Sequence, residues 1–261
     1  MSEYQYYEFL ALDRPLTAAE QEKVREYSSR ARITATSFVN EYHWGDFRGD
    51  PAQLIRDYYD AHLYLANWGT HRIMLRLPRT VLDVDAVREY CVEDLVTITD
   101  TGEHVIIDLL SEDEPEWEED AADSLAVIAG IRTELAAGDM RALYLAWLSA
   151  CGMRDEDEDE DEDEDPPVPA GLGSLTGPQR ALADFLRLDR DALKAAAADS
   201  PPLAAALEDA RTLAKWITGL PPSEKDRLLL LAAQGQGTRV TLELLQRFRQ
   251  TPAGDDGGSA P

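Results

Sequence analysis

Two short segments interleave titratable side chains with aromatic rings, a combination that is common where a loop builds a binding site. One spans residues 40–48 at the end of an expected strand, and the other spans residues 67–72 at the start of another. The first segment supplies these candidate binding residues: Tyr42, His43, Trp44, Asp46, Phe47 and Arg48. The second supplies these: Asn67, Trp68, His71, Arg72 and, further along the same strand, Arg76.

We expect the two segments to lie close together, because they end and precede neighbouring strands of one sheet. A binding cleft usually combines an aromatic floor with a few convergent polar groups. The sequence therefore predicts that Trp44 and Trp68 are mostly buried, whereas His43, Asp46 and Arg72 are at least partly accessible to solvent.

A structural alternative remains open for the first segment. In it, Trp44 and Phe47 anchor the loop in the core, while His43 and Asp46 make only local hydrogen bonds. The arginines of the second segment also have a structural alternative. They can form ion pairs within the protein, which contains 51 acidic residues. Pairing with the protein's own carboxylates is favoured over binding of a carboxylate or phosphate ligand for three of them: Arg72, Arg76 and Arg79.

A metal site is the main enzymatic alternative. It would join His43 and Asp46 to Glu41, His62 or His71, and it would make the protein a metal-assisted hydrolase. No HxH, HExxH or CxxC spacing supports such a site, and no GxSxG elbow or phosphate-binding GKS or GKT motif occurs. The sequence therefore predicts no cofactor and no metal, and it favours a protein that is not an enzyme.

The net charge of −26 is concentrated in two runs that contain no lysine or arginine. Residues 112–123 carry eight acidic side chains, and residues 155–165 carry eleven. Proteins that bind a phosphate backbone present clustered basic residues, so direct nucleic-acid binding is disfavoured. A protein partner with a basic surface is expected, and mimicry of nucleic acid by the acidic runs is a third functional hypothesis.

Periodicity predicts strands at 4–13, 33–42, 73–77, 95–99 and 104–110. Helices are expected over residues 18–28, after Asp50-Pro51, from Asp83 to near Tyr90, and twice beyond residue 121, where two helices should cover the sheet. Asp50 and Asp83 are expected helix caps, and Thr17 with Glu20 and Thr176 with Gln179 are expected capping boxes. This order matches an α+β domain of the ferredoxin-like split βαββαβ type, with an inserted helix and an extra strand.

Four regions follow from these patterns. Residues 1–153 form the α/β domain with its bridging helices, and residues 154–175 form an acidic, proline-rich disordered tether. Residues 176–250 form a small all-α domain of four helices, and residues 251–261 form a disordered tail. The first residues carry no basic leader, and no stretch of 18 uncharged apolar residues occurs, so we expect a cytoplasmic protein with no membrane contact.

The segments YQYYEFLALDRPLT, SSRARITATSFVNEYHWGDFRGDP and YLANWGTHRIMLRLP resemble the N-terminal module of a bacterial protein family with no assigned activity. The resemblance covers about residues 4–80 and implies that the HWGDF and NWGT segments are family features. It implies no activity, cofactor or catalytic residue. The favoured hypothesis is a non-enzymatic adaptor, in which the α/β domain docks a partner protein and the acidic tether presents the helical domain.

Overall fold

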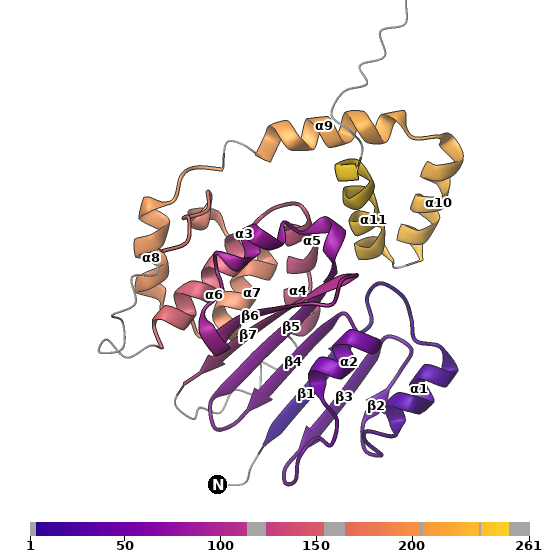
Figure 1. Ribbon diagram of the computed structural model, residues 1–261, viewed down its shortest axis with the longest axis vertical. Coiled ribbons are helices and arrows are strands. Elements are labelled where there is room, and N and C mark those ends of the chain that lie inside the picture. The colour runs from indigo at the N-terminus through magenta and orange to yellow at the C-terminus, as the bar shows by residue number, and fades with distance from the viewer. Residues whose placement is uncertain (1–3, 114–123, 154–164, 204–205, 235, 251–261) are drawn as a thin grey trace, which may run out of the picture.

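The computed structural model describes the chain except for residues 1–3, 114–123, 154–164, 204–205, 235 and 251–261 (Figure 1). Its centre is a seven-stranded sheet in the order β2-β3-β1-β4-β5-β7-β6, with every neighbouring pair antiparallel. The strands are β1 (Gln5–Leu10), β2 (Arg32–Ile33), β3 (Ser37–Tyr42), β4 (Ala61–Ala66), β5 (Thr70–Pro78), β6 (Val96–Asp100) and β7 (His104–Glu112).

The helices form two groups along the chain. The first group, before β6, comprises α1 (Ala18–Arg25), α2 (Pro51–Asp57) and α3 (Val84–Arg88). The second comprises α4 (Leu125–Ile128), α5 (Ile131–Ala136), α6 (Arg141–Cys151), α7 (Gly177–Phe185), α8 (Arg190–Asp199), α9 (Ala206–Gly219), α10 (Pro222–Ala233) and α11 (Gly237–Gln250). Short 3-10 turns are η1 (Arg79–Val81), η2 (Glu93–Leu95) and η4 (Leu172–Ser174).

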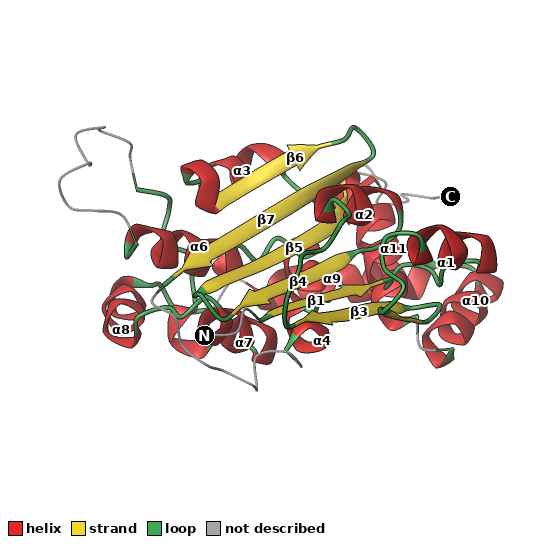
Figure 2. Ribbon diagram, turned by 90° about the horizontal axis from the view of Figure 1, so that it is seen from below, coloured by secondary structure: helices red, strands yellow, loops and turns green. Residues whose placement is uncertain are grey.

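Both faces of the sheet are covered, as the apolar character of both faces of β1 predicted. Tyr6 on β1 joins the larger core, which contains apolar residues of α3 to α7. The next residue, Tyr7, faces the opposite side and joins a smaller core with Leu54 and Ile55 of α2 and Val24 of α1. Figure 2 shows the sheet between these two layers.

One end of the sheet collects several loops, and we call it the loop end, made of residues 43–48, 67–69 and 111–113. β3 and β4 flank β1 and run antiparallel to it, so Tyr42 and Ala66 both lie opposite Gln5. Glu112 at the end of β7 lies opposite Thr70 at the start of β5. The two segments singled out in the sequence therefore leave the sheet at the same end (Figure 1).

The structure confirms a mixed α/β fold, but it does not confirm the ferredoxin-like arrangement. No strand was predicted for residues 61–66, which form β4 between β1 and β5. Leu63 and Leu65 face the larger core, whereas His62 is buried against the other face. Because both faces of β4 are covered, its sequence lacks the alternation of polar and apolar residues that marks a half-exposed strand.

The separate all-α domain is not confirmed either, because α7 shares the larger core with the sheet. Leu182 and Phe185 of α7 are buried there, and Nδ1 of His71 on β5 lies 2.6 Å from the carbonyl oxygen of Phe185. α7 starts with the predicted Thr176-Gln179 capping box, but α8 was not predicted. The predicted tail and the first half of the predicted tether lie outside the described residues, whereas residues 165–175 are described and include the buried Leu172. Within the described chain, no helix is long and apolar enough to cross a membrane.

Candidate functional site

The loop after β3 is held by hydrogen bonds to the start of β1. Gln5 Nε2 donates to the carbonyl oxygen of Gly45 at 3.1 Å. Asp46 Oδ1 accepts from the backbone N–H of Phe47 at 2.7 Å and lies 3.2 Å from the Tyr7 hydroxyl. The Phe47 ring is buried in the smaller core. These contacts fix both ends of the loop tip.

Trp44 projects from this fixed loop into solvent, with 81% of its surface exposed. Gly45 follows it with a φ of +82°, a left-handed conformation that glycine adopts without strain and that turns the chain sharply. The prediction that Trp44 is buried is therefore wrong, and so is the alternative in which Trp44 anchors the loop. Of the two rings in that alternative, only Phe47 packs in the core and anchors the loop.

The turn between β4 and β5 presents the second tryptophan in the same way. Gly69 donates its N–H to the carbonyl oxygen of Ala66 at 3.0 Å and has a φ of +103°, so residues 66–69 form a tight turn. Trp68 lies within this turn and is 42% exposed, which contradicts the prediction that it is mostly buried.

Tyr4 connects the two loops. Its N–H donates to Asn67 Oδ1 at 3.0 Å, and its carbonyl oxygen accepts from the Asn67 N–H at 3.0 Å. Its ring centroid lies 5.4 Å from that of His43, which is exposed as predicted. We define the tryptophan edge as Tyr4, its two contacts His43 and Asn67, and the tryptophans that follow these contacts in the chain, Trp44 and Trp68.

Next to the tryptophan edge, the hydroxyl groups of two tyrosines, Tyr7 and Tyr64, donate hydrogen bonds to Gln5. The Tyr7 hydroxyl lies 2.8 Å from Gln5 Oε1, and Tyr64 donates to the same oxygen at 3.1 Å. Burial, together with the neighbouring Tyr64 and the Asp46 carboxylate, raises the pKa of Tyr7 far above its ordinary value. Burial also raises the pKa of Tyr64 to about 12. Both phenols therefore stay protonated near neutral pH, which suits them to hold the loop and makes them poor general bases.

The predicted site arginines pair with the protein's own acids. Arg72 is partly accessible as expected, and its Nε and Nη2 donate to Asp108 on β7 at 2.8 and 2.5 Å. Arg76 lies towards the opposite end of β5 and donates to Asp60 Oδ1 at 2.6 Å. His71 is buried on the face of the larger core. Neither Arg76 nor His71 reaches the tryptophan edge.

The remaining candidates divide by exposure. Tyr42 is buried and meets Tyr7 edge-on, with ring centroids 5.8 Å apart. Asp46 and Arg48 are exposed, and Asp46 is accessible as predicted. Tyr42 therefore supports the loop from the core, whereas Arg48 lies on the surface beside it.

The histidines considered for a metal site do not converge. His43 is exposed at the tryptophan edge, His62 is buried against Phe9, and His71 is on the other face of the sheet. Among the described residues, no group of three or more His, Cys, Asp and Glu side chains is placed to hold a metal ion. The geometry offers no ligand set for the hydrolase alternative within that part of the chain.

Sequence reasoning missed the residues that support the loops: Tyr4, Gln5, Tyr7, Tyr64 and Asp108. The first three lie in the predicted first strand, where they were interpreted only as buried sheet residues. Tyr64 was missed because β4 was missed. The signal that could have revealed β4 is the turn sequence Asn67-Trp68-Gly69 immediately before a predicted strand, which is typical of a hairpin.

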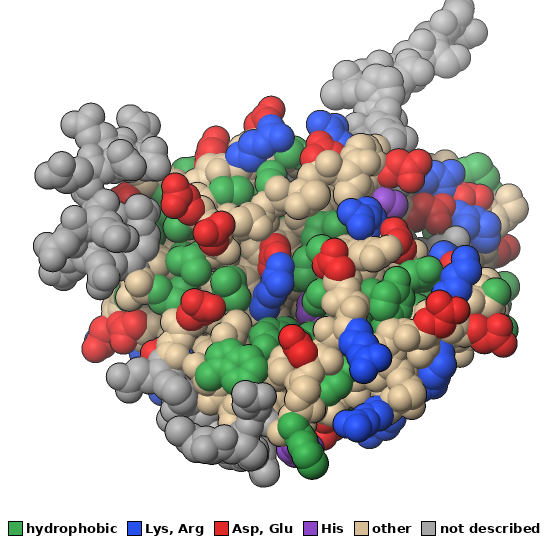
Figure 3. Space-filling view, turned by 60° about the horizontal axis from the view of Figure 1, so that its bottom comes forward, with side chains coloured by type: hydrophobic (Ala, Val, Ile, Leu, Met, Phe, Trp, Pro, Cys, Tyr) green, Lys and Arg blue, Asp and Glu red, His purple; other side chains and the backbone are tan. Residues whose placement is uncertain are grey.

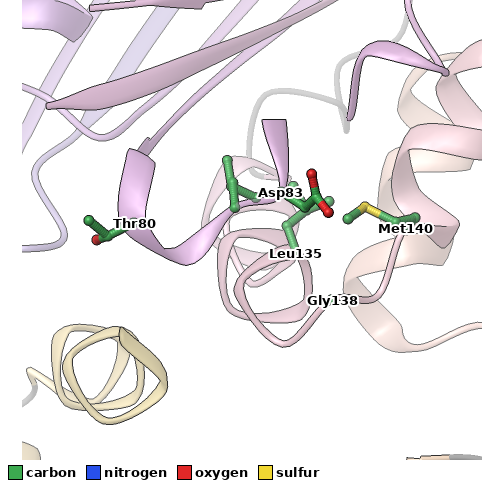
Figure 4. Close-up of a pocket in the computed structure, with 6 residues that line it drawn as sticks. Thr80, Asp83, Leu135, Gly138 and Met140 are labelled. Carbon is green, nitrogen blue, oxygen red and sulfur yellow. The ribbon is translucent and has the colours of Figure 1, made fainter. Parts of the chain in front are cut away.

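One hollow of the described surface lies away from these loops. A cavity of about 400 Å³ is lined by six residues: Thr80, Leu82, Asp83, Leu135, Gly138 and Met140. Asp83 is the only titratable group among them, and its Oδ1 accepts from the Ala86 N–H as the cap of α3 (Figure 4). None of these six residues belongs to the tryptophan edge, whose Trp44 projects from the surface.

No family model, curated protein or solved structure matches this chain. The resemblance of residues 4–80 to a bacterial family stays a prediction.

Proposed function

We propose that this protein is a non-enzymatic interaction module that docks a partner protein through the tryptophan edge. The observation that carries the proposal is the joint exposure of Trp44 and Trp68, at 81% and 42%, on two loops that both contact Tyr4. Tryptophan is enriched among the few residues that dominate binding energy at protein interfaces. Exposing two such side chains at one edge favours docking over a purely structural role.

The rigidity of the loops supports the same proposal. Hydrogen bonds from Gln5 and Tyr7 and the buried Phe47 ring hold the first loop before any partner binds. A surface that is already ordered loses little conformational entropy on association, which favours affinity. Hydrophobic side chains reach the surface among acidic and basic ones in the view of Figure 3.

The sequence-based hypothesis also gave the acidic tether the task of presenting a separate helical domain. A separate helical domain is not part of the present proposal, because residues of α7 are buried in the core of the sheet. The adaptor proposed here uses the α/β part as its docking unit.

Affinity capture with matched variants tests this function. Trp44→Ala and Trp68→Ala, alone and together, are compared with the wild-type chain and with Leu229→Ala, which removes another exposed hydrophobic side chain on α10. We expect recovery of at least one stoichiometric partner protein to fall about tenfold or more in the double variant, as for interface hot spots, and to be unchanged in Leu229→Ala. If the tryptophan variants recover every partner as well as the wild type does, the proposed docking site is wrong.

A further inference from the structure

The cavity between η1 and the end of α5 has an apolar base and a polar rim. Leu82 and Leu135 are 8% and 1% exposed, and Met140 is half-buried. Thr80 and Asp83 are exposed and supply the polar side chains of the lining. The volume of about 400 Å³ is within the range of sites that hold small molecules. A ligand that fits here buries an aliphatic group at the base and keeps a polar group at the rim.

Asp83 supplies the charge of this lining, and its carboxylate has no ion-pair partner within the described chain. Its Oδ1 accepts from the Ala86 N–H at 3.3 Å, and in Figure 4 the carboxylate points toward the Met140 side chain. Arginines of the surrounding elements η1, α3 and α6 pair with other acids: Arg79 with Asp100, Arg88 with Asp85 and Arg141 with Asp139. The cavity thus presents one negative charge that no described cation compensates.

We propose that this cavity binds a small organic ammonium ion that carries a short aliphatic chain. The ammonium group donates a charge-assisted hydrogen bond to Asp83 at the rim, and the chain lies on Leu82, Leu135 and Met140. An anion is repelled by the carboxylate, and a purely apolar ligand desolvates the carboxylate without pairing it. A metal ion is disfavoured, because the described residues place no group of three or more His, Cys, Asp and Glu side chains around one point.

Titration of the full-length, ¹⁵N-labelled protein with n-butylamine tests the site by NMR near neutral pH. The amide signals of Thr80, Ala86 and Gly138 report binding in the cavity. We expect these signals to shift saturably with butylammonium and far less with n-butanol or butyrate, the neutral and negative probes of the same chain length. Ethylamine should bind more weakly than butylamine, by up to about fourfold for each methylene group that the longer chain buries.

Asp83→Asn is the decisive variant, because asparagine caps a helix about as well as aspartate but carries no charge. It should weaken butylammonium binding about fivefold, the upper range for a partly exposed ion pair. Asp85→Asn is the matched control, since Asp85 lies on the same helix but does not line the cavity, and its binding should equal that of the wild type. The spectrum of each variant also shows whether it is folded.

Three results would overturn the proposal. Equal affinity of the wild type and Asp83→Asn for butylammonium would mean that Asp83 does not recognise the ligand. Binding of n-butanol as tight as that of butylammonium would mean that the cavity does not select a charge, and this comparison needs no variant. Shifts that do not saturate, or that spare the cavity signals, would mean that the cation associates only with the acidic protein in general. None of these results affects the docking proposed for the tryptophan edge, because the two sites share no residue.

Discussion

At the scale of single residues, burial separates the side chains that hold the loops from those that a partner can reach. Phe47 and Tyr7 are buried and fix the loop after β3. Trp44 lies two residues before Asp46 in the same loop, but it projects into solvent. Residue types alone do not make this distinction, since phenylalanine and tryptophan are both found largely buried in folded proteins. The position of Gly45 and the hydrogen bonds to β1 decide which ring points outward.

Burial also determines the titration of His62. This residue is fully buried, stacks on Phe9 with ring centroids 4.0 Å apart, and has Nδ1 2.8 Å from the carbonyl oxygen of Glu8. Burial is the main cause that lowers the pKa of His62 to about 3. Because the folded pKa lies below the unfolded value of about 6.5, the neutral form stabilises the fold fully above that pH, and this contribution is lost as pH falls towards 3.

We therefore predict that His62→Phe makes the stability less dependent on pH. The loss of unfolding free energy between pH 7 and pH 5 should be smaller than in the wild type by about 2 kcal/mol, from the linkage between proton binding and folding. Urea unfolding at the two pH values measures this difference. His43→Phe, the same substitution at an exposed position, should behave as the wild type does. An unchanged pH dependence in His62→Phe would show that His62 is solvated.

At the scale of elements, a buried ion network joins α5 to the end of the sheet opposite the loop end. Arg132 on α5 is fully buried, donates through Nε to the carbonyl oxygen of Arg76 at 2.7 Å, and donates through Nη1 and Nη2 to Asp13 at 3.1 and 2.8 Å. Asp60 accepts from Arg76 and from the backbone N–H groups of Leu12 and Asp13. Burial alone would raise the pKa of Asp60, but the guanidinium groups of Arg132 and Arg76 hold it below its ordinary value.

Replacing Arg132 by methionine should lower the free energy of unfolding by about 3 to 5 kcal/mol, because it leaves a buried carboxylate without one of its counter-charges. Chemical denaturation measures the change. Arg79→Met is the matched control, since the Arg79–Asp100 pair is exposed and solvent screening leaves such pairs little effect on stability. A loss below about 1 kcal/mol in Arg132→Met would mean that the two aspartates are already well solvated.

At the scale of the whole molecule, the second half of the chain completes the core of the first. The hydroxyls of Ser111 on β7 and Ser149 on α6 donate to the carbonyl oxygen of Leu186 at 3.0 and 2.9 Å. Arg141 Nη1 donates to the carbonyl oxygens of Gly171 and Ser174 at 3.1 and 3.0 Å, which fixes the segment that leads into α7. The boundary predicted at residues 154–175 is therefore crossed by buried contacts.

These contacts predict how the chain behaves when it is divided. Fragments 1–153 and 165–261, produced together, should copurify as one complex, and 1–153 produced alone should be much less stable than the full chain. Removing Leu182 and Phe185 from the core exposes apolar surface worth about 3 to 5 kcal/mol for each large side chain. Size-exclusion chromatography and thermal unfolding measure both effects. A 1–153 fragment as stable as the intact protein would support two independent domains.

The sequence by itself determined the features that depend on neighbouring residues. The capping boxes at Thr17-Glu20 and Thr176-Gln179, and the caps Asp50 and Asp83, form as predicted. Each is a hydrogen bond within about four residues of the chain, so the local pattern is sufficient. The hairpin of β6 and β7 was predictable for the same reason, since Gly102 adopts the positive φ that its turn requires.

Only the tertiary structure decided the features that depend on distant partners. β4 lies between β1 and β5 because both its faces are covered, and α7 belongs to the core of the sheet because Phe185 meets His71 there. The exposure of Trp44 and Trp68 follows from turns that place them at the end of the sheet, where the described part of the chain leaves them uncovered. Such contacts join residues separated by tens of positions. The hydrophobic effect is not directional and does not specify which apolar segments pack together. The sequence pattern therefore does not show which distant elements become neighbours, and only the folded structure does.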